Sequence, residues 1–167
     1  MKLFLSRVAV LVSVLYTLNS CTADASAPAT PTTVSQTTVP YPYTTFENET
    51  LTLINNYRLS IGLNALAKSD YISYKAEEHN NYMIANNVVN HNDFVARSED
   101  IMKTLGAKYV TENVAYNYNT PQAVLDAWLS SEGHEANLEG NYTHFGLSVR
   151  ENPTTGKKYY TNIFAKI

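Results

Sequence analysis

Histidines and carboxylates gather in three segments that join predicted helices and strands. His91 lies in a loop between two predicted helices, and Glu112 lies at the entry to a predicted strand. The third segment follows a tryptophan-bearing helix and holds Ser131, Glu132 and His134. Rigid scaffolds commonly build functional sites from loops that are distant in the chain. We therefore treat these three segments as the candidate site.

Two familiar catalytic motifs are absent around His134. The pair His134-Glu135 begins like a metalloprotease helix motif, but the position four after His134 is Leu138, so the second histidine is missing. Ser131 does not lie in a G-x-S-x-G turn, and a serine three residues before a histidine on one loop is poorly placed to bond to it. The sequence thus predicts neither of these two hydrolase types.

The other two histidines are expected to have structural or solvent-exposed roles. His79 lies on the apolar face of a predicted helix, where a buried or half-buried structural histidine is expected. His144 precedes a predicted strand and is expected to be exposed.

Apolar spacing and capping residues predict four helices that must position these segments. Thr44 and Glu47 have capping-box spacing, and Gly62 is placed to end the helix that they begin. Thr120 followed by Pro121 is another helix start. The predicted helices cover about 44–61, 69–86, 94–105 and 120–128.

The last third of the chain changes from helical to alternating spacing. Phe145, Leu147 and Val149 alternate with polar residues, and the pattern returns over 158–165 after a turn at 152–156. Residues 114–118 also alternate and predict a third strand. Helices followed by strands favour an α+β domain, in which helices cover a small antiparallel sheet.

The N-terminus is typical of an exported protein. Basic Lys2 and Arg7 precede the apolar stretch 8–18, which is too short to span a bilayer and predicts a signal peptide over 1–20. The sequence 18–21, Leu-Asn-Ser-Cys, resembles a bacterial lipobox and implies lipid attachment at Cys21, which would anchor the chain to a membrane. Cys21 is the only cysteine, so no disulfide is expected in the domain.

Composition sets the remaining limits on organisation and partners. Residues 21–43 are mainly Thr, Pro, Ala and Ser and predict a disordered tether, which leaves 44–167 as the folded domain. The net charge is −3, and the longest basic run is Lys157-Lys158. Phosphate binding requires a basic face, so a nucleic-acid partner is disfavoured.

Short motifs over residues 55–164 resemble those of the CAP superfamily (cysteine-rich secretory, antigen and pathogenesis-related proteins), in its bacterial form. Each motif alone is weak, but their order and spacing together are specific. The matching residues are Asn55, Arg58, Gly62, Leu63, Leu66, Ala76, His79, Met83, His91, Phe94, Arg97, Glu112, Asn113, Ala115, Trp128, Ser131, Gly133, His134, Asn137, Gly146, Val149, Phe164 and Ala165.

The resemblance implies a three-layer α-β-α sandwich with a cleft lined by two histidines and two acidic residues. By position these are His91, His134 and Glu112. The second acid departs from the pattern, because Ser131 occupies the position at which many members have glutamate. Glu132 is its neighbour and is the alternative fourth member.

Two neutral imidazoles can hold a zinc ion, but they are a thin ligand set, so modest zinc affinity is expected unless Glu112 or Glu132 also coordinates. His91 and His134 would be ligands, with Glu112 as third ligand or as base for a bound water. Glu112 is equally suited to accepting backbone hydrogen bonds and fixing the loops. Both roles stay open at this point.

We expect an exported binding or interaction module for a lipid, glycan or peptide, with zinc as a candidate cofactor. The alternative is a zinc-assisted hydrolase of envelope or peptide substrates with Glu112 as base, and a third reading is a structural domain with an inert cleft. Family members share a fold more securely than an activity, so the fold does not choose among these. No oligomeric state is predicted.

Overall fold

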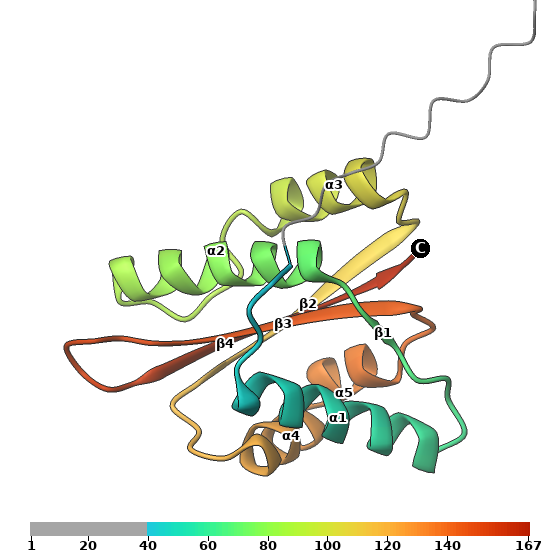
Figure 1. Cartoon of the computed structure of the whole chain (residues 1–167), viewed down its shortest axis with the longest axis horizontal. Helices are drawn as coiled ribbons and strands as arrows, with labels where there is room; N and C mark the ends of the chain where they lie inside the picture. Colours follow the sequence, from blue (N-terminus) through green and yellow to red (C-terminus); the bar gives the residue numbers. More distant parts are fainter. Residues whose placement is uncertain (1–39) are drawn as a thin grey trace, which may run out of the picture. The chain divides into compact units, whose positions relative to one another are not determined.

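The computed structural model describes residues 40–167, which form helices and strands interspersed along the chain (Figure 1). In chain order they are α1 (Thr45–Ser60), β1 (Ala67–Lys68), α2 (Asp70–Asn86), α3 (Phe94–Leu105), β2 (Tyr109–Tyr116), α4 (Pro121–Leu129), α5 (Glu132–Glu139), β3 (His144–Glu151) and β4 (Lys158–Lys166). The predictions for the signal peptide, for Cys21 and for the tether up to residue 39 lie outside the described residues. Within the described part, no helix is long and apolar enough to cross a membrane.

Capping side chains set the starts of three of the four predicted helices, and α3 begins without a side-chain cap. Thr44 Oγ1 accepts a hydrogen bond from the backbone N–H of Glu47 at 3.1 Å, and the Glu47 carboxylate accepts one from the backbone N–H of Thr44 at 2.8 Å. Ser69 and Thr120 cap α2 and α4 through their hydroxyl groups. The four predicted helices are confirmed, and α5 is an additional helix that the sequence did not predict.

Residues just before α1 pack onto the domain. Tyr41 is 4 % exposed, and its hydroxyl lies 3.0 Å from Glu47 Oε1 and 3.0 Å from Ser148 Oγ. Tyr43 is half-buried, with its hydroxyl 2.8 Å from Ser73 Oγ. The sequence had assigned both tyrosines to the tether, whereas here they contact α2 and β3.

The sheet has the strand order β1-β3-β4-β2. β3 and β4 form the predicted antiparallel hairpin, and β2 pairs antiparallel with β4, with Glu112 opposite Ile163. The expectation of a purely antiparallel sheet needs correction, because the two residues of β1 pair in parallel with β3. β2 also begins at Tyr109 rather than near 114, so Glu112 lies within the strand.

Helices cover both faces of the sheet, as the three-layer prediction requires. α2 and α3 lie on one face, and α1, α4 and α5 lie on the other (Figure 1). The larger core, on the α1/α4/α5 side, includes Ile54, Trp128, Leu138, Phe145 and Phe164. Side chains of α2 and α3 pack against the opposite face around Ile72, Ile101 and Ile163. β2 is the edge strand between these two helical layers.

Candidate binding site

Glu112 is the buried centre of the site. Its side chain is 1 % exposed although it lies on an edge strand. Along β2, Glu112 and Val114 face α2 and α3, whereas Asn113 faces α5. A strand thus sends adjacent side chains into two different helical layers. Side chains from both layers can therefore meet at this edge of the sheet.

Arg97 of α3 pairs with the Glu112 carboxylate at both oxygens. Arg97 Nε donates to Oε2 at 2.8 Å, and Nη2 donates to Oε1 at 2.9 Å. The Arg97 side chain is 9 % exposed, so water competes little with this bidentate pair. The carboxylate is therefore neutralised and fixed in orientation by the first turns of α3.

His91 is the third member of this centre. Its Nδ1 lies 2.9 Å from Glu112 Oε1, and its side chain is 47 % exposed. A carboxylate only accepts hydrogen bonds, so Nδ1 carries the proton and Nε2 is left to meet a ligand or solvent. The predicted proximity of His91 and Glu112 is present in the structure.

His79 lies behind the carboxylate. It is 2 % exposed, and its Nε2 lies 2.8 Å from the carbonyl oxygen of Asn90 and 3.8 Å from Glu112 Oε1. Burial lowers the pKa of His79 below its ordinary value, although the nearby Glu112 carboxylate acts in the opposite direction. His79 is thus the buried histidine that the sequence predicted, and it also belongs to the site.

His134 approaches from the opposite helical layer, in the first turns of α5. Burial and the charge of His91 both lower the pKa of His134, so the imidazole is neutral at pH 7. Asn113 Nδ2 donates to the carbonyl oxygen of His134 at 3.0 Å, and Asn137 Nδ2 donates to Asn113 Oδ1 at 2.8 Å. These two amides hold α5 in register with β2 and so place His134 relative to Glu112.

The same helical layer closes the free edge of β2. Asn137 Nδ2 also donates to the carbonyl oxygen of Glu112 at 3.3 Å, and Trp128 Nε1 donates to that of Val114 at 3.1 Å. An unpaired edge strand could otherwise form hydrogen bonds with a strand of another chain. The carbonyl oxygens of Glu112 and Val114 are therefore already bonded within the domain.

Neither candidate for the fourth cleft position bonds to Glu112. Ser131 is the residue before α5 and makes no side-chain cap bond, and Glu132 is exposed in the first turn of α5. Within residues 40–167, the side chains that hydrogen-bond to the Glu112 carboxylate come from His91 and Arg97. Membership of Ser131 or Glu132 in the cleft stays a prediction.

Sequence reasoning missed His79 and Arg97 as members of the site. Arg97 was noted as part of a family motif, but no role followed from it. One physical signal was available: a carboxylate predicted to lie inside a cleft requires a cation or several donors nearby. Arg97, three residues after the start of α3 and six after His91, was the basic residue placed to supply it.

The carboxylate of Glu112, one of the three predicted zinc ligands, already accepts hydrogen bonds within the protein. Within the described residues, no group of three or more His, Cys, Asp or Glu side chains is arranged to hold a metal ion. Glu112 is bonded by Arg97 and His91, so a zinc ion that used Glu112 as third ligand does not fit this arrangement. A zinc site on His91 and His134 alone stays a prediction.

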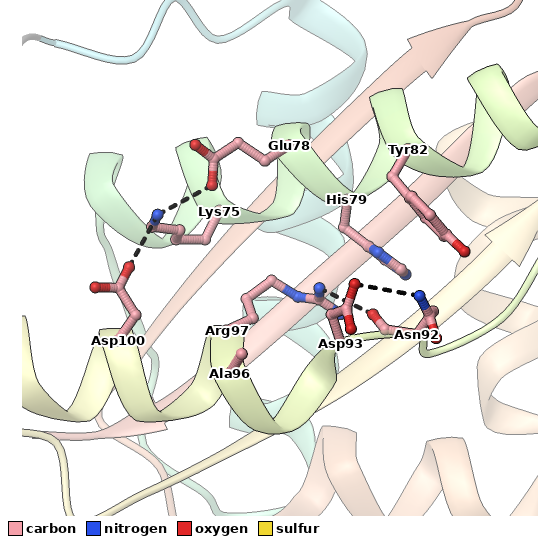
Figure 2. Close-up of a pocket in the computed structure, with 9 residues that line it drawn as sticks. All are labelled: Lys75, Glu78, His79, Tyr82, Asn92, Asp93, Ala96, Arg97 and Asp100. Carbon is pink, nitrogen blue, oxygen red and sulfur yellow. Dashed lines mark hydrogen bonds and ion pairs between the residues drawn. The ribbon is translucent and has the colours of Figure 1, made fainter.

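A cavity of about 360 Å³ opens between α2 and α3 beside this centre (Figure 2). Figure 2 shows that α2 supplies one wall and that α3 with the loop before it supplies the other. His79 and Arg97, which both lie against Glu112, belong to its lining. The complete lining is Lys75, Glu78, His79, Tyr82, Asn92, Asp93, Ala96, Arg97 and Asp100.

The lowered histidine pKa values predict how stability depends on pH. His79 and His134 are harder to protonate in the folded chain than in the unfolded chain, whose histidine pKa is about 6.5. Their contribution to stability is therefore present above pH about 6.5 and is lost as the pH falls through the folded values. In urea unfolding, the free energy of unfolding should fall less between pH 7.5 and pH 5 for His134→Gln than for the unmodified chain. An equal loss in both chains would show that His134 contributes nothing.

Known proteins share both the sequence and the fold. The profile of the cysteine-rich secretory protein (CAP) family matches residues 51–164. A Bacillus subtilis protein described as uncharacterized protein YkwD is 35 % identical over 133 residues, which cover 77 % of this chain and 51 % of that protein. The B. subtilis membrane protein YlbC, also described as uncharacterized, is 34 % identical over 130 residues, covering 74 % of this chain and 35 % of that protein. The chain thus spans about half, or less, of the length of these curated relatives.

Solved structures agree with this relationship. An outer surface protein from Borrelia burgdorferi superposes with a TM-score of 0.64 at 21 % identity, covering 71 % of this chain and 90 % of that one. An extracellular Bacillus anthracis protein containing an SCP domain superposes with a TM-score of 0.62 at 27 % identity, covering 72 % and 40 % respectively. The family profile covers more than half of the chain, and its ordered motifs lie on the expected elements. This chain is a member of the cysteine-rich secretory protein (CAP) family.

Proposed function

We propose that this protein is an exported binding module, whose centre of His91, Glu112 and His134 takes a lipid, glycan or peptide ligand. The observation that carries the proposal is the double hydrogen bond from Arg97 to the buried Glu112 carboxylate. This pairing makes Glu112 an anchor that orients His91. The imidazoles of His91 and His134 then provide the hydrogen-bonding groups for the ligand.

The same pairing argues against the hydrolase alternative. A general base must be able to accept a proton from water or substrate. For Glu112 to do so, it would have to leave Arg97 as a nearly buried, unpaired cation, which is strongly unfavourable. Glu112 is therefore better suited to positioning than to proton transfer.

Export and anchoring are part of the same proposal. The apolar stretch 8–18 and the lipobox-like sequence that ends at Cys21 favour export followed by lipid attachment. The names of the matched proteins support a location outside the cytoplasm, since they include an outer surface protein, an extracellular protein and a membrane protein. The bound ligand would then belong to the cell envelope or its surroundings.

A binding screen with a matched variant tests this proposal. The full chain is exposed to neutral and anionic oligosaccharides, peptides and phospholipid vesicles, and NMR follows the ring signals of its histidines. We expect at least one class to shift the His91 and His134 signals without being cleaved, and we expect the double variant His91→Ala/His134→Ala to lose this binding. The proposal fails if no class binds, or if the bound class is hydrolysed by the unmodified chain and not by Glu112→Gln.

A further inference from the structure

The residues that line the cavity between α2 and α3 indicate which class of ligand fits there. The histidine centre alone does not distinguish among the classes. The cavity shares Asn92, Asp93 and Ala96 with a second hollow that His91 lines, so a ligand at His91 can extend into the cavity across the start of α3. Its volume of about 360 Å³ lies at the small end of the range for small-molecule sites. Its charges and its one tyrosine ring decide which ligand chemistry it accepts.

The basic groups of the cavity are already paired. Lys75 Nζ lies 3.0 Å from Glu78 Oε2 and 2.9 Å from Asp100 Oδ2, and both pairs are drawn in Figure 2. Arg97 is engaged by Glu112 and also donates to the carbonyl oxygen of Asn92 at 3.2 Å. An anionic ligand would meet the carboxylates of the lining without an unpaired cation to receive it. Phosphate, sulfate and acidic sugars are therefore disfavoured.

The lining also disfavours an acyl chain. Most of its side chains are charged or polar, and they come from both walls. A hydrocarbon would remove these groups from water and offer no hydrogen bond in return, which is unfavourable for each of them. A lipid tail therefore matches this cavity less well than a ligand that carries hydrogen-bonding groups.

A sugar ring has the complementary chemistry. Each hydroxyl group both donates and accepts a hydrogen bond, so it can insert between paired donors and acceptors such as Lys75 and Asp100 without needing net charge. Asn92 and Asp93, at the start of α3, are both exposed and add a donor and an acceptor at the mouth.

One aromatic side chain completes the match. The Tyr82 ring lies nearly parallel to that of His79, with 5.9 Å between centroids and 11° between planes. Figure 2 shows the two rings side by side on α2. Tyr82 is half-buried in the lining, so its apolar ring and polar hydroxyl can contact the C–H groups and the hydroxyl rim of a sugar.

We propose that this cavity is a subsite for an uncharged sugar ring, so that the ligand of the module is a neutral glycan. This inference rests on the proposed function and selects one of its three ligand classes.

A cavity-filling variant tests the inference. Ala96 lines the cavity from α3 and makes no ion pair, so Ala96→Leu fills the space while leaving Lys75, Arg97 and their partners in place. Leucine also suits a helix nearly as well as alanine. Asn81→Leu places the same side chain at an exposed, uncharged position of α2 outside the lining and is the control. The full chain and both variants are applied to an array of neutral oligosaccharides, N-acetylated ones included, beside sulfated and sialylated ones.

The unmodified chain and Asn81→Leu should bind neutral oligosaccharides and not acidic ones. Ala96→Leu should bind the neutral ones about ten-fold more weakly or worse, the equivalent of losing one or two ligand hydrogen bonds. Binding confined to acidic glycans, or equal binding by Ala96→Leu, overturns the inference. If no glycan binds but vesicles or peptides shift His91 and His134, the inference is wrong while the proposed function stands. If nothing binds at all, both are wrong.

Discussion

Replacing Arg97 with methionine should lower the free energy of unfolding by about 3–5 kcal/mol, because it leaves the Glu112 carboxylate buried without its cation. His91 would be the remaining side-chain hydrogen-bond partner of the Glu112 carboxylate, and the His91 side chain is itself half exposed. A loss of this size is a large fraction of the total stability of an ordinary domain. Urea unfolding followed by circular dichroism measures it.

A double-mutant cycle separates the ion pair from simple loss of packing. Arg97→Met/Glu112→Gln removes both charges, so most of the stability lost in Arg97→Met should return. Arg97→Lys keeps the charge but not the bidentate geometry and should fall between the two. If the effects of Arg97→Met and Glu112→Gln simply add, the two side chains do not act as a pair, and Glu112 is not anchored in the way described here.

Replacing Gly146 with alanine should destabilise the domain by about 3 kcal/mol or more, because no space exists for the added carbon. An ideal Cβ at Gly146 would lie 2.4 Å from the backbone nitrogen of Ser73 and 2.6 Å from the carbonyl carbon of Ile72. Both are backbone atoms of α2, so no side-chain rotation relieves the overlap. α2 would have to move away from β3, and it carries His79 with it.

Gly133→Ala is the matched control for this substitution. Gly133 lies inside α5, and an added Cβ meets no atom within 4 Å. Alanine favours a helix over glycine, so Gly133→Ala should be neutral or should stabilise by up to about 1 kcal/mol. The midpoint temperature of thermal unfolding should therefore fall for Gly146→Ala and stay unchanged or rise for Gly133→Ala. A mild effect at Gly146 would mean that α2 does not lie so close to the sheet.

The elements that the sequence predicted are those whose ends carry local signals. Thr44 with Glu47, Ser69, and Thr120 with Pro121 each satisfy backbone groups within a few residues of themselves, so their effect can be read without tertiary structure. The hairpin of β3 and β4 was equally local, because its turn lies between two alternating segments.

Elements that depend on distant contacts were not predictable in the same way. α5 buries only Leu138 and has Gly133 in its first turn, so it shows no apolar periodicity. β1 has two exposed residues and exists because it pairs with β3, far away in the chain. The first residues of β2 are too mixed to show alternation, and pairing with β4 defines them.

The site was predictable to the extent that the family motifs identify positions. They indicated His91, Glu112 and His134, and the structure places His91 against Glu112 and couples His134 to the same strand through Asn113. They did not indicate what holds the carboxylate. That information lies in the orientation of α3 across β2, which brings Arg97 to Glu112 over 15 residues of chain.

The central claim is that Glu112 stays bound to Arg97 as an anchor while His91 and its neighbours meet the ligand. NMR of the Arg97 guanidinium tests it most directly, in the free chain and in the chain saturated with whichever class binds in the screen. We expect a slowly exchanging Nε–H and hindered rotation of the guanidinium in both states, with the ligand recovered uncleaved. A guanidinium that rotates freely once ligand binds, together with ligand cleavage that Glu112→Gln abolishes, would contradict it and identify Glu112 as a base.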